Sequence, residues 1–523
     1  MSVLLIHPPV SKPCEPPPGI ANLCGALQAH GVRAATLDMN LGGLLTLIEG
    51  VRDPTDTWTR RAVRNRTRHL DLLRNPAGYS DFSTYKRAIL DVNRLLQVFG
   101  HSRGLNLTLA NYQSQSHSPL RSLDLIQAAE NPEGNPFYPF FKEVLPSVVK
   151  LKTPQVVGFS LNYLSQAVCT FAMIGFLKNR FPRLAIILGG GLVTSWIRRP
   201  GWENPFGGLV DSLVAGPGEE HLLSYLGKTS SEATTHGLPD FHAFPLSDYL
   251  SPGFVLPYAA SSGCYWNRCV FCPERAEGNP YRRLDTARVL QDLKSLTSRR
   301  RPVLIHFLDN ALSPTLLVRL ARDWRDVPWY GFARIGDPLA DLDFCRALKK
   351  SGCVMLQLGV ESGDPGVLEK LGKGIDLKVA SRVLKNLRKA GIAAYVYLLF
   401  GTPAESEKEA RETLRFAVRH SEEIRFLNLA LFNLPAHGEE ARNLATGAFY
   451  GGDLSFYSSF IHPRGWNRDA VRSFLDKEFK RHPAMAPIIR RDPPIFTSNH
   501  AAFFLESAES TNGEKKLVDP FNL

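Results

Sequence analysis

The chain has 523 residues, of which 44% are hydrophobic and 21% charged, and its formal net charge is +12. These proportions exclude an intrinsically disordered chain, and the length predicts two or three domains. No apolar run reaches about 18 residues, so we expect no membrane-spanning helix. The eight cysteines and a short apolar start that ends in two prolines do not resemble a secreted protein with a signal peptide. We therefore expect a cytoplasmic protein that uses neither a disulfide framework nor a membrane.

The first 228 residues alternate short apolar runs with helical patterns. The expected strands are residues 3–6, 32–37, 156–160, 184–188 and 209–215, and the expected helices are residues 19–28 and 166–180. Glycine-rich turns follow several of these strands, and such turns let a ligand approach the backbone at the carboxyl edge of a parallel sheet. The pattern predicts an α/β domain with a Rossmann-like parallel sheet in residues 1–228 and a linker over residues 229–253.

A helical insertion, at about residues 45–150, interrupts this sheet. An insertion of that length is expected to be a lid or a partner surface. Five arginines lie close together in it, and they are Arg60, Arg61, Arg64, Arg66 and Arg68. With the net charge they raise the possibility of a nucleic-acid partner, but no RNA-binding signature accompanies them. We therefore favour a solvated helix face and do not expect nucleic acid as a partner.

Three cysteines, Cys264, Cys269 and Cys272, follow a strand-like run at residues 254–260. Thiolates suit an iron–sulfur cluster or zinc, and a disulfide would leave one thiol unpaired. A structural zinc site closes with a fourth ligand, and neither His nor a further Cys lies nearby in the sequence. A 4Fe–4S cluster held by three cysteines keeps one iron open for a substrate or cofactor. The alternative, three thiols buried in a core, fits this spacing less well.

From residue 254 onward, apolar runs and helical patterns alternate six times. The expected strands are residues 255–260, 303–308, 329–334, 354–360, 393–400 and 424–431. The expected helices are residues 284–296, 314–324, 342–350, 379–390 and 405–420. This alternation predicts a partial (β/α)6 barrel over residues 254–431, whose functional groups lie at the carboxyl ends of the strands. The cysteine loop follows the first of these strands.

The cysteine loop resembles that of the radical S-adenosylmethionine (SAM) superfamily, which has the pattern Cys-x3-Cys-x2-Cys with an aromatic residue before the last cysteine. Phe271 is that aromatic residue, whereas the first gap is four residues long here. Later strand ends resemble the elongator-protein-like radical SAM domain at Asp309, Arg334, Glu361, Ser362 and Gly401.

The resemblance implies that the three cysteines bind the metal cluster and that Phe271 and these strand-end residues bind SAM. Glu361 would accept hydrogen bonds from the ribose, Arg334 would pair with the methionine carboxylate, and Gly401 would leave room for adenine. Asp309 would hold the ammonium group. For Asp309 and Arg334, a strand-end cap or a surface ion pair is the competing interpretation.

Residues 3–38 and 156–226 resemble the cobalamin-binding-type domain that precedes the radical domain in one branch of the superfamily. The resemblance implies a corrinoid site formed by Pro8, Pro9, Gly19, Ser160, Gly189, Gly190, Gly216, Gly218 and Glu219. The Asp-x-His-x-x-Gly pattern, whose histidine ligates cobalt in many cobalamin proteins, does not occur after the first strand. We interpret His242, in the linker, as a packing residue. A sheet that has lost cobalamin is an alternative.

Residues 432–523 combine aromatic residues, histidines and many prolines. We expect this region to cap the barrel mouth and to shape the substrate pocket. His462 and His500 are interpreted as packing residues rather than acid–base groups. The polar tail after Ser507 is expected to be disordered.

The resemblance implies an enzyme that binds a 4Fe–4S cluster, SAM and cobalamin, and that reductively cleaves SAM to a 5′-deoxyadenosyl radical. It would methylate an unactivated carbon of a small molecule or peptide, with an electron donor such as flavodoxin or ferredoxin. No side chain is assigned a catalytic role beyond holding these cofactors. A radical SAM cyclase, rearrangement or oxidation enzyme, with or without cobalamin, is the alternative. An RNA-modifying methylthiotransferase-like protein ranks lower, because the N-terminal cysteines lack that family's spacing.

Overall fold

The computed structural model describes residues 2–52, 54, 56–228, 237–449, 451–495 and 500–505. The chain forms two compact units, residues 1–253 with 450–456, and residues 254–449 with 457–523. The division at 253/254 coincides with the expected start of the barrel. Residues 229–236 of the expected linker and the tail after Ser507 lie outside the described residues. Among the helices that are described, none is long and apolar enough to cross a lipid bilayer.

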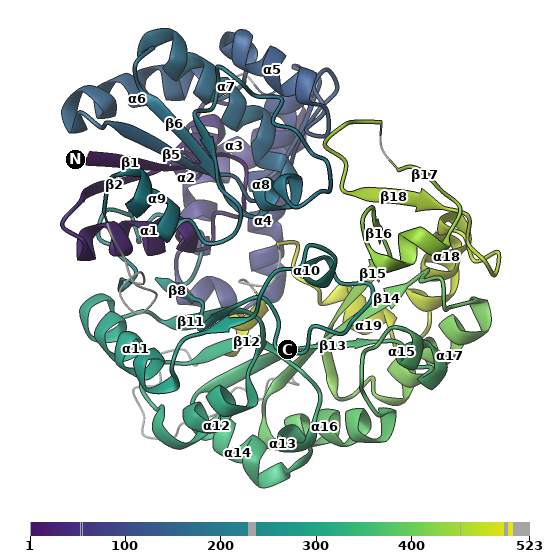
Figure 1. The fold of residues 1–523 in the computed structure, drawn as a ribbon. Helices are drawn as coiled ribbons and strands as arrows, with labels where there is room; N and C mark the ends of the chain where they lie inside the picture. Colours follow the sequence, from purple (N-terminus) through teal and green to yellow (C-terminus); the bar gives the residue numbers. More distant parts are fainter. Residues whose placement is uncertain are drawn as a thin grey trace. The chain divides into compact units, whose positions relative to one another are not determined.

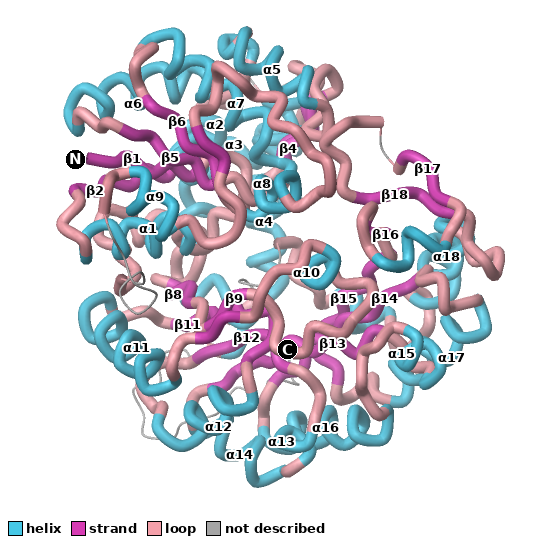
Figure 2. The backbone as a smooth tube through the Cα atoms, in the orientation of Figure 1, coloured by secondary structure: helices cyan, strands magenta, loops and turns pink. Residues whose placement is uncertain are grey.

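The first unit is built on a five-stranded parallel sheet with the order β2-β1-β5-β6-β7. Its strands are β1 (Ser2–His7), β2 (Arg33–Asp38), β5 (Val156–Ser160), β6 (Ala185–Gly189) and β7 (Ser212–Leu213). β1 and β5 are buried along their whole length, as expected when helices cover both faces of a parallel sheet. Figure 2 shows helices on both sides of these strands. The predicted parallel α/β fold is confirmed.

The helices around this sheet begin and end close to the expected positions. Those that follow the strands are α1 (Pro18–Ala29), α7 (Leu164–Arg180), α8 (Gly191–Ile197) and α9 (Glu219–Tyr225). The last strand, β7, is much shorter than the predicted residues 209–215. Just before it, the Asp211 carboxylate accepts a hydrogen bond from the backbone N–H of Ile186 and so takes the place of a ladder partner.

The insertion in the first unit is mainly helical. It contains α2 (Met39–Glu49), α3 (Thr57–Leu73), α4 (Phe82–His101), the hairpin strands β3 (Leu105–Leu107) and β4 (Tyr112–Ser114), α5 (Ser122–Glu130) and α6 (Tyr138–Lys152). Three aspartates, Asp38, Asp56 and Asp81, cap the N-termini of α2, α3 and α4 by accepting backbone N–H hydrogen bonds. Helices α3 and α4 pack against each other.

The second unit is the predicted six-stranded parallel sheet, with the order β15-β14-β13-β12-β11-β8 (Figure 1). Its strands are β8 (Val255–Tyr258), β11 (Leu304–Leu312), β12 (Trp329–Ala333), β13 (Cys353–Glu361), β14 (Ala393–Phe400) and β15 (Ile424–Leu431). The connecting helices include α11 (Thr286–Arg300), α12 (Pro314–Asp323), α14 (Leu342–Lys350), α16 (Leu377–Ala390) and α17 (Glu407–Arg419). Because each strand adds beside its predecessor in the chain, every carboxyl end lies along the same edge.

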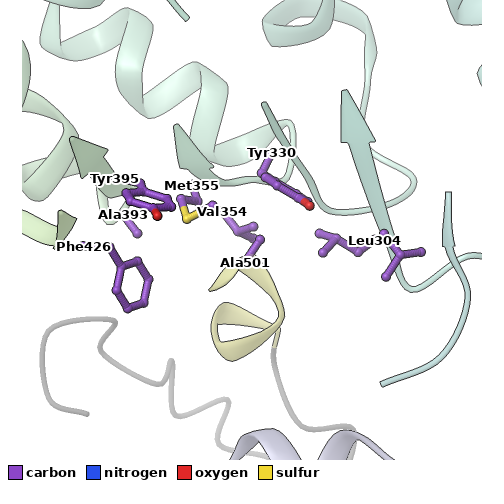
Figure 3. Packing of buried hydrophobic residues seen from close by; sticks show 9 residues of the cluster. Leu304, Tyr330, Val354, Met355, Ala393, Tyr395, Phe426 and Ala501 are labelled. Carbon is purple, nitrogen blue, oxygen red and sulfur yellow. The ribbon is translucent and has the colours of Figure 1, made fainter. Parts of the chain in front are cut away.

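A hydrophobic cluster closes the opposite, amino-terminal end of these strands. It contains Val255, Leu304 and Ala393 from the first residues of three strands, together with Ala501. Figure 3 shows Ala501, from the short helix η5 (Ala501–Phe504), among the side chains of the strands. The last described segment is therefore a plug for the amino-terminal end of the barrel.

The position of this plug differs from the prediction that the whole of residues 432–523 caps the mouth of the barrel. His500 stacks on Tyr395 at 4.6 Å and meets Phe426 edge-on at 4.7 Å, so it lies at the end of the barrel opposite the cysteine loop. Two apolar partners draw it there, since burying ring area is favourable. In contrast, the Nε2–H of His462 donates a hydrogen bond to the Thr402 carbonyl, just after β14. Both histidines are buried, as expected for packing residues.

The remainder of the C-terminal region forms a small antiparallel sheet with the order β16-β18-β17 and short helices. Its elements are β16 (Leu434–Pro435), β17 (Thr446–Ala448), β18 (Tyr457–Phe460), α18 (Arg468–Phe474) and α19 (Ala486–Arg490). Phe432 and Leu434 pack with Leu399 near the end of β14. This part of the region therefore lies at the carboxyl ends of the barrel strands.

Candidate functional site: a cysteine loop at the carboxyl ends of the barrel strands

The three cysteines lie in one loop directly after the first barrel strand. The loop starts at β9 (Ser261–Ser262) and is closed by antiparallel pairing with β10 (Arg282–Arg283). Gly263 has φ +70°, and a Cβ there would lie 2.5 Å from the Pro280 carbonyl oxygen, so glycine is required for this closure. Cys264, Cys269 and Cys272 are half-buried. This places all three at the carboxyl edge of the barrel, as predicted.

The donor set suits a cluster better than a single ion. No group of three or more His, Cys, Asp or Glu residues in the described part of the chain is arranged to hold one metal ion. A tetrahedral zinc site gathers its ligands within about 2.3 Å of one centre, whereas each cysteine of a cubane binds a different iron. Three thiols in one loop are a donor set that fits a 4Fe–4S cluster.

Two of the thiols are held in their neutral form. Burial raises the pKa of Cys272 to about 11, although backbone N–H groups of the following turn, α10 (Pro273–Ala276), act in the opposite direction. Burial also raises the pKa of Cys269, against the charges of Lys373 and Arg334. Metal binding needs thiolates, so cluster assembly at this loop must release protons.

The loop is fastened to the segment after α15 (Pro365–Lys370). Val270 donates its N–H to the Leu371 carbonyl at 3.1 Å, and the Trp266 indole N–H donates to the Gly372 carbonyl at 2.9 Å. A Cβ at Gly372 would lie 2.5 Å from the Arg268 carbonyl oxygen. These contacts bring the cysteines beside the residues that follow β13.

Arg334, directly after β12, contacts both the cysteine loop and the segment after α15. Its guanidinium carbon is 3.9 Å from the centre of the Trp266 ring, and one N–H donates to the Lys373 carbonyl at 2.6 Å. The predicted strand-end residue is therefore beside the cysteine loop. Stacking on an indole restricts a guanidinium while leaving other N–H groups available for a carboxylate.

Glu361, at the end of β13, has an unusual backbone conformation. Its φ is +67°, a left-handed value that is costly for a residue with a side chain. Its carboxylate accepts a 2.8 Å hydrogen bond from the Lys373 ammonium, and the two side chains are only 12% and 11% exposed. A Cβ at Gly359 would lie 2.4 Å from Glu361 Oε1, so the glycine makes room for this carboxylate. Lys373 was not predicted as a site residue.

Asp309 makes the contacts of a strand-end cap, the competing interpretation for this residue. Its two carboxylate oxygens accept hydrogen bonds from the Ala260 N–H at 3.0 Å and the Ser261 hydroxyl at 2.5 Å. Burial raises its pKa, against these hydrogen bonds. The side chain therefore caps the end of β8 and supports the start of the cysteine loop, and its contact with the ammonium group of SAM stays a prediction.

Ser362 is also structural. It is fully buried, shares a hydrogen bond with the Thr413 hydroxyl at 3.2 Å and accepts one from the Asp364 N–H at 3.1 Å. These contacts shape the turn after β13, and the contact of Ser362 with SAM stays a prediction. Phe271 is half-buried and packs with Leu371 on one side and Leu399 on the other.

Gly401 ends β14 in the left-handed region, with φ +80°. Its N–H donates to the carboxylate of Glu405, which also accepts from the Trp466 indole at 3.0 Å. Glu405 is fully buried, and burial raises its pKa to about 7. The Gly401 turn is thus held by a carboxylate that sequence reasoning did not single out, although it lies only four residues further on.

In the first unit, the residues of the predicted corrinoid site share the carboxyl edge of the sheet. Pro8 and Pro9 follow β1, Ser160 ends β5, Gly189 and Gly190 lie at the end of β6, and Gly216, Gly218 and Glu219 lie between β7 and the start of α9. Gly19 lies close to Ser160, since a Cβ there would be 3.3 Å from its hydroxyl oxygen. The structure brings the whole predicted set to one edge.

This edge has the features of a ligand cradle. Gly216 has φ +74°, and a Cβ there would meet no atom within 4 Å, so the turn faces open space. Gln166 ties the first two turns together, because its amide donates to the Pro8 carbonyl and accepts from the Asn162 N–H. The strand order also reverses between β1 and β5, which is where doubly wound sheets bind ligands. These residues fit a cofactor that is bound largely through backbone.

His7, the last residue of β1, was not predicted from the sequence as a site residue. It is buried, its Nε2 is 2.8 Å from the Ser11 hydroxyl, and its Nδ1 has no hydrogen-bond partner among the described residues. Burial lowers its pKa in spite of the nearby Asp38 charge, so the ring is neutral. The cobalt-ligand pattern places its histidine after the strand and so does not indicate one within it. His242, in contrast, is exposed rather than packed.

A parallel partial barrel with three cysteines at its first strand end defines a radical SAM domain. Residues 258–417 match the family model described as the radical SAM superfamily, and the chain therefore carries a radical SAM domain. The predicted recognition of this superfamily is confirmed.

Three curated relatives are named for methyl transfer. An uncharacterized methyltransferase of Pyrococcus horikoshii is 24% identical over 304 residues, which are 52% of this chain and 65% of that protein. Hopanoid C-3 methylase of Methylococcus capsulatus is 25% identical over 55% of this chain and 60% of its own length. Bacteriochlorophyllide d C-12(1)-methyltransferase of Chlorobaculum tepidum is 27% identical over 36% of this chain and 42% of its own length. The chain thus spans less than two thirds of each.

Two solved structures share the fold of both units. TsrM from Kitasatospora setae, a radical SAM methyltransferase with cobalamin and a 4Fe–4S cluster bound, has a TM-score of 0.53 and 16% identity, covering 94% of this chain and 89% of that one. OxsB, a cobalamin-dependent SAM radical enzyme, has a TM-score of 0.55 and 12% identity. The match covers 97% of this chain and 72% of OxsB. At these identities the likeness concerns the fold.

Proposed function

We propose that this protein is a cobalamin-dependent radical SAM methyltransferase that acts on an unactivated carbon of a small molecule or peptide. The observation that carries the proposal is the loop of Cys264, Cys269 and Cys272 at the carboxyl end of β8. A second sheet, with open glycine turns along its own carboxyl edge, supports the corrinoid. The names of the curated relatives support methyl transfer to carbon.

In this proposal, each cofactor has a matching set of residues. When bound, the cluster and SAM supply radical chemistry, and the corrinoid carries the methyl group. Glu361, oriented by Lys373, accepts hydrogen bonds from the ribose hydroxyls, and Arg334 pairs with the methionine carboxylate. The Gly401 turn leaves space for adenine, while Asp309 positions the cysteine loop.

The region after β15 supports a pocket for the substrate. Four residues of this region lie at the carboxyl ends of the strands: Phe432 and Leu434 pack with Leu399, His462 contacts Thr402, and Trp466 contacts Glu405. We propose that this part shapes the substrate pocket and excludes water from the radical. A flavodoxin or ferredoxin would supply the electron.

The test is anaerobic reconstitution of the full-length protein with iron, sulfide, cobalamin and SAM. Reduced protein should show the EPR signal of a 4Fe–4S cluster, bound corrinoid absorbance, and release of 5′-deoxyadenosine and S-adenosylhomocysteine. Replacing Cys264, Cys269 or Cys272 with Ala should abolish the cluster signal. Cys24→Ala, which removes a thiol from α1, is the control and should retain it.

The corrinoid has its own matched pair of variants. Gly216→Val places a side chain at the proposed cradle, whereas Gly208→Val does so at another left-handed glycine with open space, in the loop before β7. Only the first should lose corrinoid. Retained corrinoid in Gly216→Val would remove this turn from the site. Deoxyadenosine release by a protein that binds no corrinoid would instead support a radical SAM cyclase, rearrangement or oxidation enzyme.

A further inference from the structure

The helical insertion of the first unit contains a cavity of about 160 Å³ between α3 and α4. The polar residues that line it are Arg61, Asn65, Arg68, His69, Thr84 and Arg87. On α3, Arg61, Asn65 and Arg68 are three or four residues apart, so they project from one face of the helix. Part of the arginine cluster that the sequence predicted to be a solvated helix face therefore borders an enclosed space.

The charges around the cavity do not cancel. Arg61 is paired with the buried Asp91 at 2.5 Å. Arg68 and Arg87 are exposed, and neither has a carboxylate within 4.0 Å in the part of the chain that the structure describes. The remaining nearby acid, Asp81, caps α4 by accepting from the Ser83 and Thr84 N–H groups. The charge of Arg87 helps to lower the pKa of the Asp81 carboxyl, but neither Arg68 nor Arg87 forms an ion pair with a described residue.

His69 shows that the guanidinium groups converge. This side chain is 6% exposed, and its Nδ1 lies 3.5 Å from the Asp91 carboxylate without a hydrogen bond. Burial lowers its pKa, Asp91 opposes this effect, and the charges of Arg68, Arg61 and Arg87 lower it further. Three cations from two helices therefore act on one imidazole at the floor of the cavity.

We propose that this cavity binds a small phosphate-bearing anion, either inorganic phosphate or the phosphoryl group of a small molecule. Guanidinium groups from both helices can donate paired N–H groups to phosphate oxygens, and the Asn65 amide and Thr84 hydroxyl can add single donors. A cavity of about 160 Å³ has room for one phosphate group. The inference does not depend on the proposed function, because the cavity lies in the insertion.

The test is isothermal titration of the full-length protein with inorganic phosphate and with glycerol 3-phosphate, in a buffer that contains neither phosphate nor sulfate. Saturable binding of either ligand supports the site, and a preference for the ester identifies a phosphoryl group as its ligand. Arg68→Gln with Arg87→Gln should weaken binding at least about tenfold. Both arginines are exposed, so the urea unfolding midpoint should stay unchanged.

The control removes the same amount of charge from the insertion. Arg60 and Arg64 are exposed on α3 and do not line the cavity, so Arg60→Gln with Arg64→Gln should change the affinity less than about twofold. An equal loss in this control would reduce the effect to a general positive field and overturn the proposal. Absence of saturable binding up to about 10 mM phosphate and ester, in the unmodified protein, would overturn it as well.

Discussion

The buried pair of Glu361 and Lys373 offers the sharpest test of how the site is held. The two charged atoms are 2.8 Å apart, and about one tenth of each side chain is exposed. At an effective dielectric constant of about 20, their attraction is about 6 kcal/mol, most of which offsets the cost of removing both charges from water. The net contribution of the ion pair to the free energy of unfolding is therefore small. Removing only one of its partners, however, costs much more.

Lys373→Met should destabilise the barrel by about 3–5 kcal/mol, because Glu361 would remain charged and buried. The double variant Glu361→Gln with Lys373→Met leaves no buried charge and should recover at least about half of this loss. Hydrogen exchange of peptides from β13, with β1 of the other unit as the internal reference, measures the local stability in each protein. The reconstituted single variant should also bind SAM more weakly, since its Glu361 carboxylate is no longer oriented.

Equal protection of β13 in the single and double variants would refute this reasoning. That outcome would mean that the carboxylate does not depend on Lys373, and that the left-handed conformation of Glu361 is maintained by other contacts. A double variant that is less stable than the single one would refute it equally.

Two further predictions concern the same edge of the barrel. Gly359→Ala should weaken SAM binding at least about tenfold while keeping the cluster, because its Cβ would displace the Glu361 carboxylate. The control is Gly336→Ala, where a Cβ meets no atom within 4 Å. Equal affinities of the two variants for SAM would contradict the prediction. Glu405 has a pKa of about 7 in the folded protein against its ordinary value of 4.5, so folding favours its protonated form. As pH rises from about 4.5 to 7, the free energy of unfolding of the unmodified protein should therefore fall by about 3 kcal/mol relative to that of Glu405→Gln. Urea unfolding of both proteins across this pH range measures the difference. Unfolding free energies that change with pH in the same way in both proteins would disprove the prediction.

Several site residues could be predicted because local sequence determines their place. Cysteines separated by four and then two residues must share a loop, and apolar runs that alternate with helical patterns must form strands whose carboxyl ends lie along one edge. Arg334, Glu361 and Gly401 were predicted from the resemblance to the radical SAM domain, and each directly ends or follows a strand.

The features that the sequence did not predict depend on contacts between distant segments. Lys373 reaches Glu361 from beyond a helix, and Asp309 accepts a hydrogen bond from Ala260, the residue before β9. His500 lies at the opposite end of the barrel because Tyr395 and Phe426 offer it two aromatic surfaces. No spacing in the sequence reports such contacts.

The sequence by itself determined the class of chemistry, the two parallel sheets and the edges at which their ligands would bind. The two sheets follow from residue type and periodicity, which act within one element, whereas the class of chemistry follows from the cysteine loop and its resemblance to the radical SAM superfamily. Only the tertiary structure decided which side chains are free to bind and which are occupied in holding the loops. It also decided that arginines on two helices enclose one cavity, because the direction of a side chain depends on the packing of segments far apart in the chain.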